Sequence, residues 1–151
     1  MLATEIEAKP FLKWAGGKRQ LLEQFELKYP ETLKNNEIKT YIEPFVGGGA
    51  VFFELTKHYN FEKIVLNDAN HELINTYKSV KNEVDAVIER LKEMEEEYLP
   101  LETENRKEIY YARRDNFNDE KKELNFNEFT KAHIEHAAKF IFLNRTCFNG
   151  L

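Results

Sequence analysis

The spacing of apolar and polar positions predicts two strands joined by a helix in the first half of the chain. Residues 40–42 form a short apolar run with the character of a strand end, and residues 50–59 carry apolar side chains at helical spacing. Residues 61–68 then form a second run that is rich in β-branched side chains. A strand, a helix and a strand at this spacing make a βαβ unit, so we expect a parallel strand pair with a right-handed crossover.

On both sides of this unit the apolar pattern predicts helices. One helical pattern follows Lys18, and residues 24–39, which contain Pro30, are predicted to be a helix end followed by a loop. From Ala69 onward the chain is predicted to be helical for most of its length, with a break at residues 98–100. The apolar stripes fall within residues 73–80, 84–94, 108–117 and 132–143. We therefore expect a helical cluster packed beside the sheet.

Composition narrows the class of protein. A chain of 151 residues is about one domain, and 42% hydrophobic with 32% charged residues is typical of a soluble, globular protein. No apolar run approaches the roughly 20 residues of a membrane span, and residues 1–9 lack the apolar core of a signal peptide. Cys147 is the single cysteine, so no internal disulfide is expected and the cytoplasm is the predicted location. The net charge of −5 gives little support for nucleic-acid binding.

A glycine cluster separates the first predicted strand from the helix that follows it. Gly47, Gly48 and Gly49 allow the backbone to turn through positive φ and to approach a ligand closely. Asp68 ends the second predicted strand, 21 positions after Gly47. An acid at about this distance accepts hydrogen bonds from ribose hydroxyls in sheets that bind adenosine. The pattern predicts a nucleotide-type pocket, although a glycine cluster of this kind also serves as a plain tight turn.

A second glycine turn lies near the N-terminus, where Gly16 and Gly17 stand between Trp14 and Lys18. It is not a P-loop, because that motif needs a glycine at position 12 and a serine or threonine at position 19. A lysine beside glycines at a helix start suits a carboxylate or phosphate, and the indole can stack on a base. The alternative is that Trp14 belongs to the core and Lys18 is solvated.

Two further residue types are weak candidates for chemistry. His133 and His136 are three positions apart and share a helix face, but no third ligand stands at motif spacing, so we expect no metal. Cys147 has no histidine near it in the sequence, which argues against a nucleophilic role.

The sequence as a whole resembles the Dam-like family of DNA adenine methyltransferases. The resemblance covers the whole chain in the family's order and is carried by four segments: FLKWAGGK at 11–18, EPFVGGGA at 43–50, NDAN at 67–70 and LNRTCFNGL at 143–151. It implies an α/β fold, namely a partial Rossmann-like S-adenosylmethionine-dependent methyltransferase fold with an inserted helical target-recognition domain. The implied domains are residues 1–81, which bind S-adenosylmethionine, and residues 82–151, the helical start of the recognition domain.

The resemblance also implies roles for individual residues. Trp14, Lys18 and Asp68 would contact S-adenosylmethionine. A loop would wrap around the methionine end of this ligand, and its implied contact residues are Glu43, Phe45, Gly47, Gly48 and Gly49. The implied partner is duplex DNA with a flipped adenine, and GATC is the candidate target sequence. The resemblance implies neither a membrane partner nor a bound metal. Arg145 and Asn149 are candidates for contacting DNA, and a structural hinge is the alternative for that segment.

One departure from the family pattern is as informative as the matches. Family members carry an Asp-Pro-Pro-Tyr catalytic motif after the recognition domain, whereas the prolines here stand singly at positions 10, 30, 44 and 100. We therefore expect that this chain is the N-terminal part of a methyltransferase and contains no catalytic residue. We also expect no methyltransferase activity from the chain alone. The alternatives are a non-catalytic fragment that binds S-adenosylmethionine or DNA, and a nicotinamide-dependent oxidoreductase, whose G-x-G-x-x-G fingerprint differs from the G-G-G-A found here.

Overall fold

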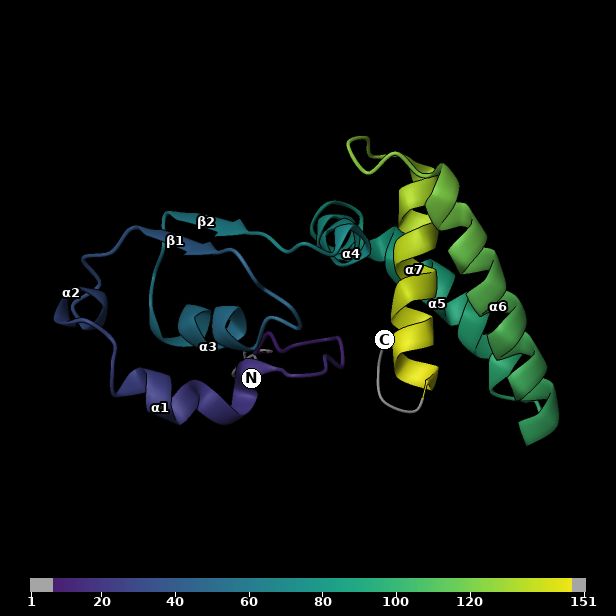
Figure 1. Cartoon of the computed structure of the whole chain (residues 1–151), viewed down its shortest axis with the longest axis horizontal. Helices are drawn as coiled ribbons and strands as arrows, with labels where there is room; N and C mark the ends of the chain where they lie inside the picture. The colour runs from purple at the N-terminus through teal and green to yellow at the C-terminus, as the bar shows by residue number, and fades with distance from the viewer. Residues whose placement is uncertain (1–6, 148–151) are drawn as a thin grey trace, which may run out of the picture. The chain divides into compact units, whose positions relative to one another are not determined.

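Two short parallel strands form the sheet of the first part of the chain. The computed structural model describes residues 7–147, and within them the chain divides after Ala69 into two units. β1 (Thr40–Glu43) pairs in parallel with β2 (Lys63–Leu66), and Glu43 lies opposite Leu66. The helix α3 (Ala50–His58) connects them, and Figure 1 shows the strands side by side. The predicted α/β pattern with a parallel strand pair is confirmed.

Neighbouring residues of β1 differ sharply in exposure. Ile42 and Val65 lie opposite each other in the strand register and are 62% and 37% exposed. Glu43, the next residue along β1, is buried, as expected because successive strand residues point to opposite faces. Parallel sheets are usually covered on both faces. Ile42 and Val65 are therefore an apolar pair of the kind that a parallel sheet normally covers.

Short helices precede the sheet. The helical pattern after Lys18 becomes a 3₁₀ turn, η1 (Lys18–Leu21), followed by α1 (Leu22–Glu26). Within residues 24–39 the predicted helix end is confirmed, because α1 ends at Glu26, but the predicted loop contains a one-turn helix, α2 (Glu31–Lys34). Pro30 precedes it with φ of −68°, a value that suits the entry to a helix. The buried side chain of Leu33 anchors this turn.

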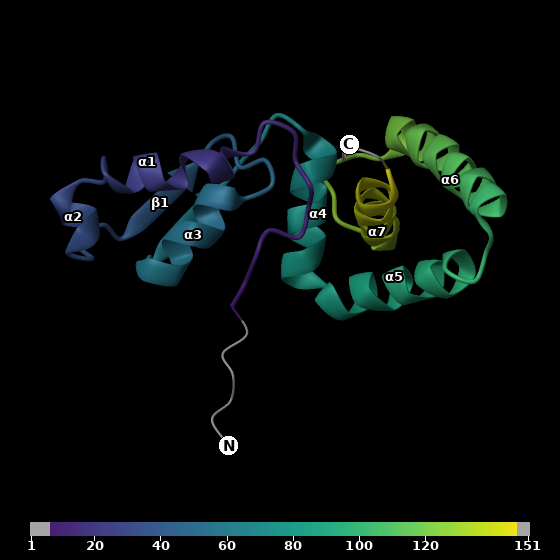
Figure 2. The same cartoon turned by 90° about the horizontal axis from the view of Figure 1, so that it is seen from below.

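The second unit consists of helices, as the apolar stripes predict. They are α4 (His71–Asn82), α5 (Val84–Tyr98), α6 (Thr103–Glu123) and α7 (Lys131–Thr146). Figure 2 looks nearly along α7 and shows the other three helices of this unit arranged around it. Because α7 has neighbours on several sides, most of its residues from His133 to Asn144 are buried. The apolar core of the unit is formed by Leu73, Val87, Met94, Phe117, Ala137, Ala138, Phe140, Phe142 and Leu143.

Side chains that cap the helices fix where α4 and α7 begin. The Oδ1 atom of Asn70 accepts a hydrogen bond from the backbone N–H of Leu73, at 2.9 Å. Thr130 and His133 form a reciprocal capping box at the start of α7, in which the backbone N–H of Thr130 donates to Nδ1 of His133. Nδ1 is therefore an acceptor, which leaves Nε2 to donate to the carbonyl oxygen of Asn125 at 3.0 Å. His133 thus has a structural role in the turn before α7.

Neither a membrane-crossing helix nor a metal-ligating cluster is found in the described part of the chain. The helices within residues 7–147 are too short or too polar to cross a bilayer. The same residues hold no group of three or more histidine, cysteine, aspartate or glutamate side chains suited to a metal ion. The units divide after Ala69, whereas the predicted functional boundary lies between Lys81 and Asn82, and that functional boundary stays a prediction.

A cluster of ionisable side chains, of which Glu72 and His136 are buried, links three helices of the second unit. Glu72 of α4 pairs with Nζ of Lys121 on α6 at 2.9 Å, and its Oε1 lies 3.7 Å from Nε2 of His136 on α7. Nδ1 of the same imidazole lies 3.6 Å from Oε2 of Glu120, and Glu120 also pairs with Lys139 at 2.5 Å. His136 is fully buried. The cluster therefore places the His136 ring between two carboxylates beside the core of the helical unit.

This cluster predicts a loss of stability in acid. Burial acts to raise the pKa of Glu72, but the neighbouring His136 and Lys121 outweigh it and hold that pKa below its usual value of 4.5. A carboxylate with a lowered pKa stabilises the fold above its unfolded-state pKa, and this contribution is lost as the pH falls through the folded-state pKa. We expect urea unfolding of Glu72→Gln to show a smaller loss of stability between pH 7 and pH values under 4.5 than the wild type. Glu95→Gln, an exposed change on α5, should lose as much stability over this pH range as the wild type does. An equal loss in all three proteins would contradict the role given to Glu72.

Candidate functional site

The turn between β1 and α3 requires glycine at two positions. Gly47 and Gly49 have φ values of 51° and 80°, in the left-handed region where a side chain is strained. The backbone N–H of Gly49 donates to the carbonyl oxygen of Val46 at 2.8 Å, which closes the turn. Gly49 directly precedes α3, so the turn delivers the chain into the helix.

Trp14 packs against this turn. A Cβ atom built on Gly47 would lie 2.9 Å from Cδ1 of Trp14, and one built on Gly48 would lie 3.0 Å from Cβ of Trp14. The first distance is too short for two carbon atoms, and at the second Trp14 would have to shift by a few tenths of an ångström, so the glycines allow the indole to approach the turn this closely. The two glycine motifs, which are far apart in the sequence, therefore meet in one place. The sequence left open whether Trp14 is a core residue or a ligand contact, and the structure places it half-buried over Gly47 and Gly48.

Lys18 joins the same place through a carboxylate. Its Nζ donates to Oε1 of Glu43 at 2.5 Å and to the carbonyl oxygen of Phe45 at 2.7 Å. The other carboxylate oxygen of Glu43 accepts a hydrogen bond from the hydroxyl of Tyr41, at 2.5 Å. Sequence reasoning missed Tyr41. The available signal was its position two residues before Glu43 on one strand, which places both side chains on the same face.

Strand pairing that continues past β1 and β2 brings Asp68 to the glycine turn. The backbone N–H of Asn67 donates to the carbonyl oxygen of Glu43 at 2.8 Å, and that of Val46 donates to the carbonyl oxygen of Asn67 at 2.9 Å. One residue further along each of these two segments, the backbone N–H of Gly47 donates to Oδ2 of Asp68 at 2.9 Å. The sequence spacing between Gly47 and Asp68 thus corresponds to a direct contact.

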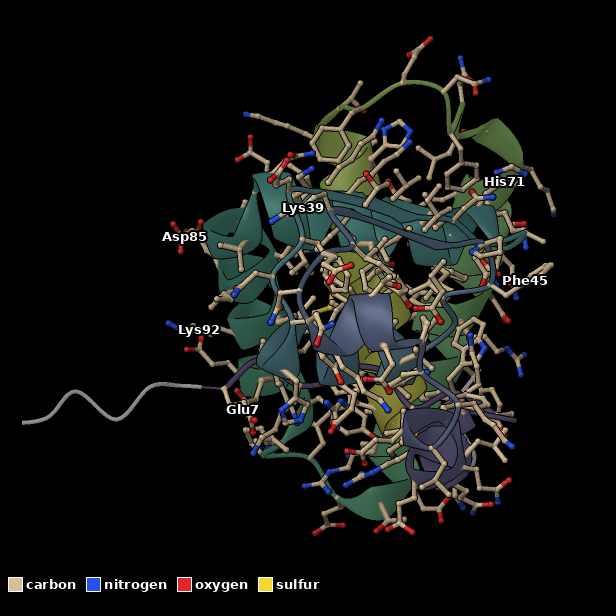
Figure 3. The ribbon with its side chains drawn as sticks, turned by 90° about the vertical axis from the view of Figure 1, so that its left-hand side faces the viewer. Glu7, Lys39, Phe45, His71, Asp85 and Lys92 are labelled. Carbon is tan, nitrogen blue, oxygen red and sulfur yellow. The ribbon has the colours of Figure 1, made fainter. Side chains whose placement is uncertain are left out.

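The remaining predicted residues lie outside this set of contacts. Phe45, labelled in Figure 3, is 71% exposed, and only its backbone oxygen takes part in the bonds around Lys18. Arg145 is exposed in the last turn of α7, in the second unit. Asn149 lies outside the described residues. The structure therefore brings together Trp14, Lys18, Glu43, Gly47, Gly48 and Asp68.

A glycine turn between a parallel strand and a helix, with an acid after the next strand, is an arrangement that α/β nucleotide-binding proteins share. Comparison with known sequences specifies the family. Residues 14–151 match the D12 class N6 adenine-specific DNA methyltransferases. The chain belongs to this family.

Individual relatives agree with this result. The chain is 51% identical over 146 residues to the type II methyltransferase M.MjaIII of Methanocaldococcus jannaschii, covering 97% of this chain and 48% of that protein. It is 37% identical over 150 residues to the DNA adenine methylase of Haemophilus influenzae, covering 99% of this chain and 44% of the relative. The type II methyltransferase M1.LlaDCHI of Lactococcus lactis is 37% identical, with 97% and 44% covered. The chain spans about half the length of these relatives.

Proposed function

We propose that this chain provides the S-adenosylmethionine-binding part of a DNA methyltransferase that modifies the exocyclic amino group of adenine in duplex DNA. The observation that carries the proposal is the hydrogen bond between Gly47 and Asp68, which joins the glycine turn to the strand-end acid. Family membership supports the reaction class. The relatives include proteins named DNA adenine methylase and type II methyltransferase, which supports a role in DNA methylation or in restriction and modification.

The chemistry of the contact set fits the proposed donor. S-adenosylmethionine supplies an electrophilic methyl group and carries an adenosine, two ribose hydroxyls and a methionine carboxylate. In the proposal Asp68 accepts from the ribose hydroxyls, as strand-end acids do in related sheets. The Glu43–Gly49 loop passes along the methionine end, Phe45 included, and Trp14 and Lys18 border it. Glycine in this loop keeps the backbone accessible to the ligand.

The finer architecture is part of the same proposal. The parallel pair β1 and β2 would be one portion of a Rossmann-like methyltransferase sheet, which is consistent with the exposed Ile42 and Val65 on one face. Residues 1–81 would bind the donor, and residues 82–151 would begin an inserted recognition domain. The proposed partner is duplex DNA with a flipped adenine, because a base inside a duplex is inaccessible to a methyl donor. Arg145 and Asn149 remain candidates for contacting the DNA, and GATC remains the candidate target.

Replacing Asp68 tests the proposal directly. We expect calorimetry to detect binding of S-adenosylmethionine, and not of NAD, to the 151-residue chain. Asp68→Ala should weaken that binding by about ten- to a hundredfold. The substitution removes a charged group that accepts hydrogen bonds from the glycine turn and, in the proposal, from S-adenosylmethionine. Asp68→Asn, which retains an oxygen acceptor for Gly47, should have a smaller effect.

The matched control is Asp85→Ala, an exposed aspartate on α5 that is labelled in Figure 3. It should leave the affinity at the wild-type value. Unchanged affinity in Asp68→Ala would refute the assignment of Asp68, and a wild-type chain that binds NAD but not S-adenosylmethionine would favour the oxidoreductase alternative.

A further inference from the structure

The hydroxyl of Tyr41 completes a chain of contacts that ends at the glycine turn. It donates to Oε2 of Glu43 at 2.5 Å, while Oε1 of the same carboxylate accepts from Nζ of Lys18 at 2.5 Å. Lys18 in turn donates to the carbonyl oxygen of Phe45 at 2.7 Å. Phe45 lies two residues before Gly47, so the contacts lead from the middle of β1 to the start of the turn.

The orientation of the Glu43 carboxylate depends on the hydrogen bonds that it accepts from Tyr41 and Lys18, because its surroundings are buried. Glu43 is 5% exposed, so water has little access to replace a lost hydrogen bond. The ring of Tyr41 is held by stacking on Phe61, with centroids 5.4 Å apart and ring planes 30° apart. Burial, together with the hydrogen bond to Glu43, raises the pKa of Tyr41 far above its usual value, so the hydroxyl stays a donor at physiological pH.

We propose that Tyr41 is a positioning residue, which fixes the rotamer of Glu43 and thereby holds Lys18 and the Phe45–Gly49 backbone in the arrangement that binds the methyl donor. The part that concerns donor binding rests on the function proposed above. Tyr41 itself lies on the strand before the turn and acts through Glu43. Two donors on opposite oxygens of one buried carboxylate leave it a single well-defined orientation.

Tyr41→Phe separates the hydroxyl from the ring, because the stacking on Phe61 is retained. In the absence of ligand we expect amide hydrogen exchange to accelerate about tenfold at Gly47 and Gly49, whose N–H groups are bonded to Asp68 and Val46. Affinity for S-adenosylmethionine should fall by a similar factor. Exchange at Leu73, in the helical unit, should stay at its wild-type rate.

Tyr29→Phe is the matched control. The hydroxyl of Tyr29 is buried in the same unit and has no hydrogen-bond partner among the described residues, so its removal should change neither readout. A second test places Tyr41→Phe in a Glu43→Gln background, where its effect should shrink to within about twofold because its route of action is already altered. Full additivity of the two substitutions would overturn the proposed route through Glu43.

The two readouts keep this inference distinct from the proposed function. Wild-type exchange rates at Gly47 and Gly49 in Tyr41→Phe would refute the positioning role. Accelerated exchange with unchanged donor affinity would refute the link to donor binding. If the wild-type chain binds no S-adenosylmethionine, the proposed function fails, and the exchange rates still decide whether Tyr41 holds the turn.

Discussion

Gly47→Ala should reduce the free energy of unfolding of the first unit by about 2 to 5 kcal/mol. A left-handed conformation costs an ordinary residue about 1 to 2 kcal/mol. The added Cβ would also stand 2.9 Å from the indole of Trp14, and overpacking of this kind typically costs about 1 to 3 kcal/mol more. Fluorescence of Trp14, the single tryptophan, follows the unfolding of this unit in urea. Donor affinity should fall more than about tenfold, because relief of the contact displaces the turn.

Gly16→Ala separates the two causes. Gly16 also has a positive φ, of 70°, but a Cβ atom built there meets nothing within 4 Å. We expect it to cost about 1 to 2 kcal/mol, which is the conformational part alone. If Gly47→Ala proves no more destabilising than Gly16→Ala, the close packing of Trp14 against Gly47 does not contribute to the cost of the substitution.

Leu143→Ala should destabilise the helical unit by about 2 to 5 kcal/mol. The side chain lies on α7, which packs among the other helices of its unit, and it is fully buried. Truncation removes buried methyl groups and leaves a cavity that the surrounding helices fill only in part. Since small domains are stable by only about 5 to 15 kcal/mol, this is a large fraction of the total. Circular dichroism in the far ultraviolet, followed during urea unfolding, measures the change.

Ile88→Ala provides the comparison for that substitution. Ile88 lies on α5 of the same unit and is 44% exposed, so a large part of its side chain is already in water. Its truncation should cost about 0.5 kcal/mol or slightly more. Similar losses for the two variants would mean that α7 does not form the centre of this unit.

The helices of the second unit were predictable because their apolar stripes are long and regular. α4, α5 and α7 follow from residues such as Leu73, Val87 and Leu143, which recur at helical spacing and are buried. α6 was predicted only over residues 108–117, whereas it spans Thr103–Glu123. Its two ends are polar and carry no periodic signal. α2 was missed because four residues are too few to show a period.

The candidate site was predictable where its chemistry is local in the sequence. The glycine cluster and the spacing to Asp68 follow from the geometry of parallel strands, and the structure joins Gly47 to Asp68 directly. The packing of Trp14 on Gly47 was not predictable, because it depends on how two distant turns approach each other. Tyr41 was missed for a related reason. A strand sequence does not say which of its faces will carry a buried carboxylate.

The stacking of Phe117 on His136 means that the proton NMR signals of His136 report on the packing of the helical unit. The two rings come from α6 and α7, and their centroids lie 4.1 Å apart with only 7° between their planes. Protons of the imidazole therefore lie over the face of the phenyl ring, where its ring current shields them and moves their resonances upfield. The chain has four histidines, so these signals fall in a sparse region of the proton spectrum. Separation of α6 from α7 would return them to their ordinary positions, without any label attached to the protein.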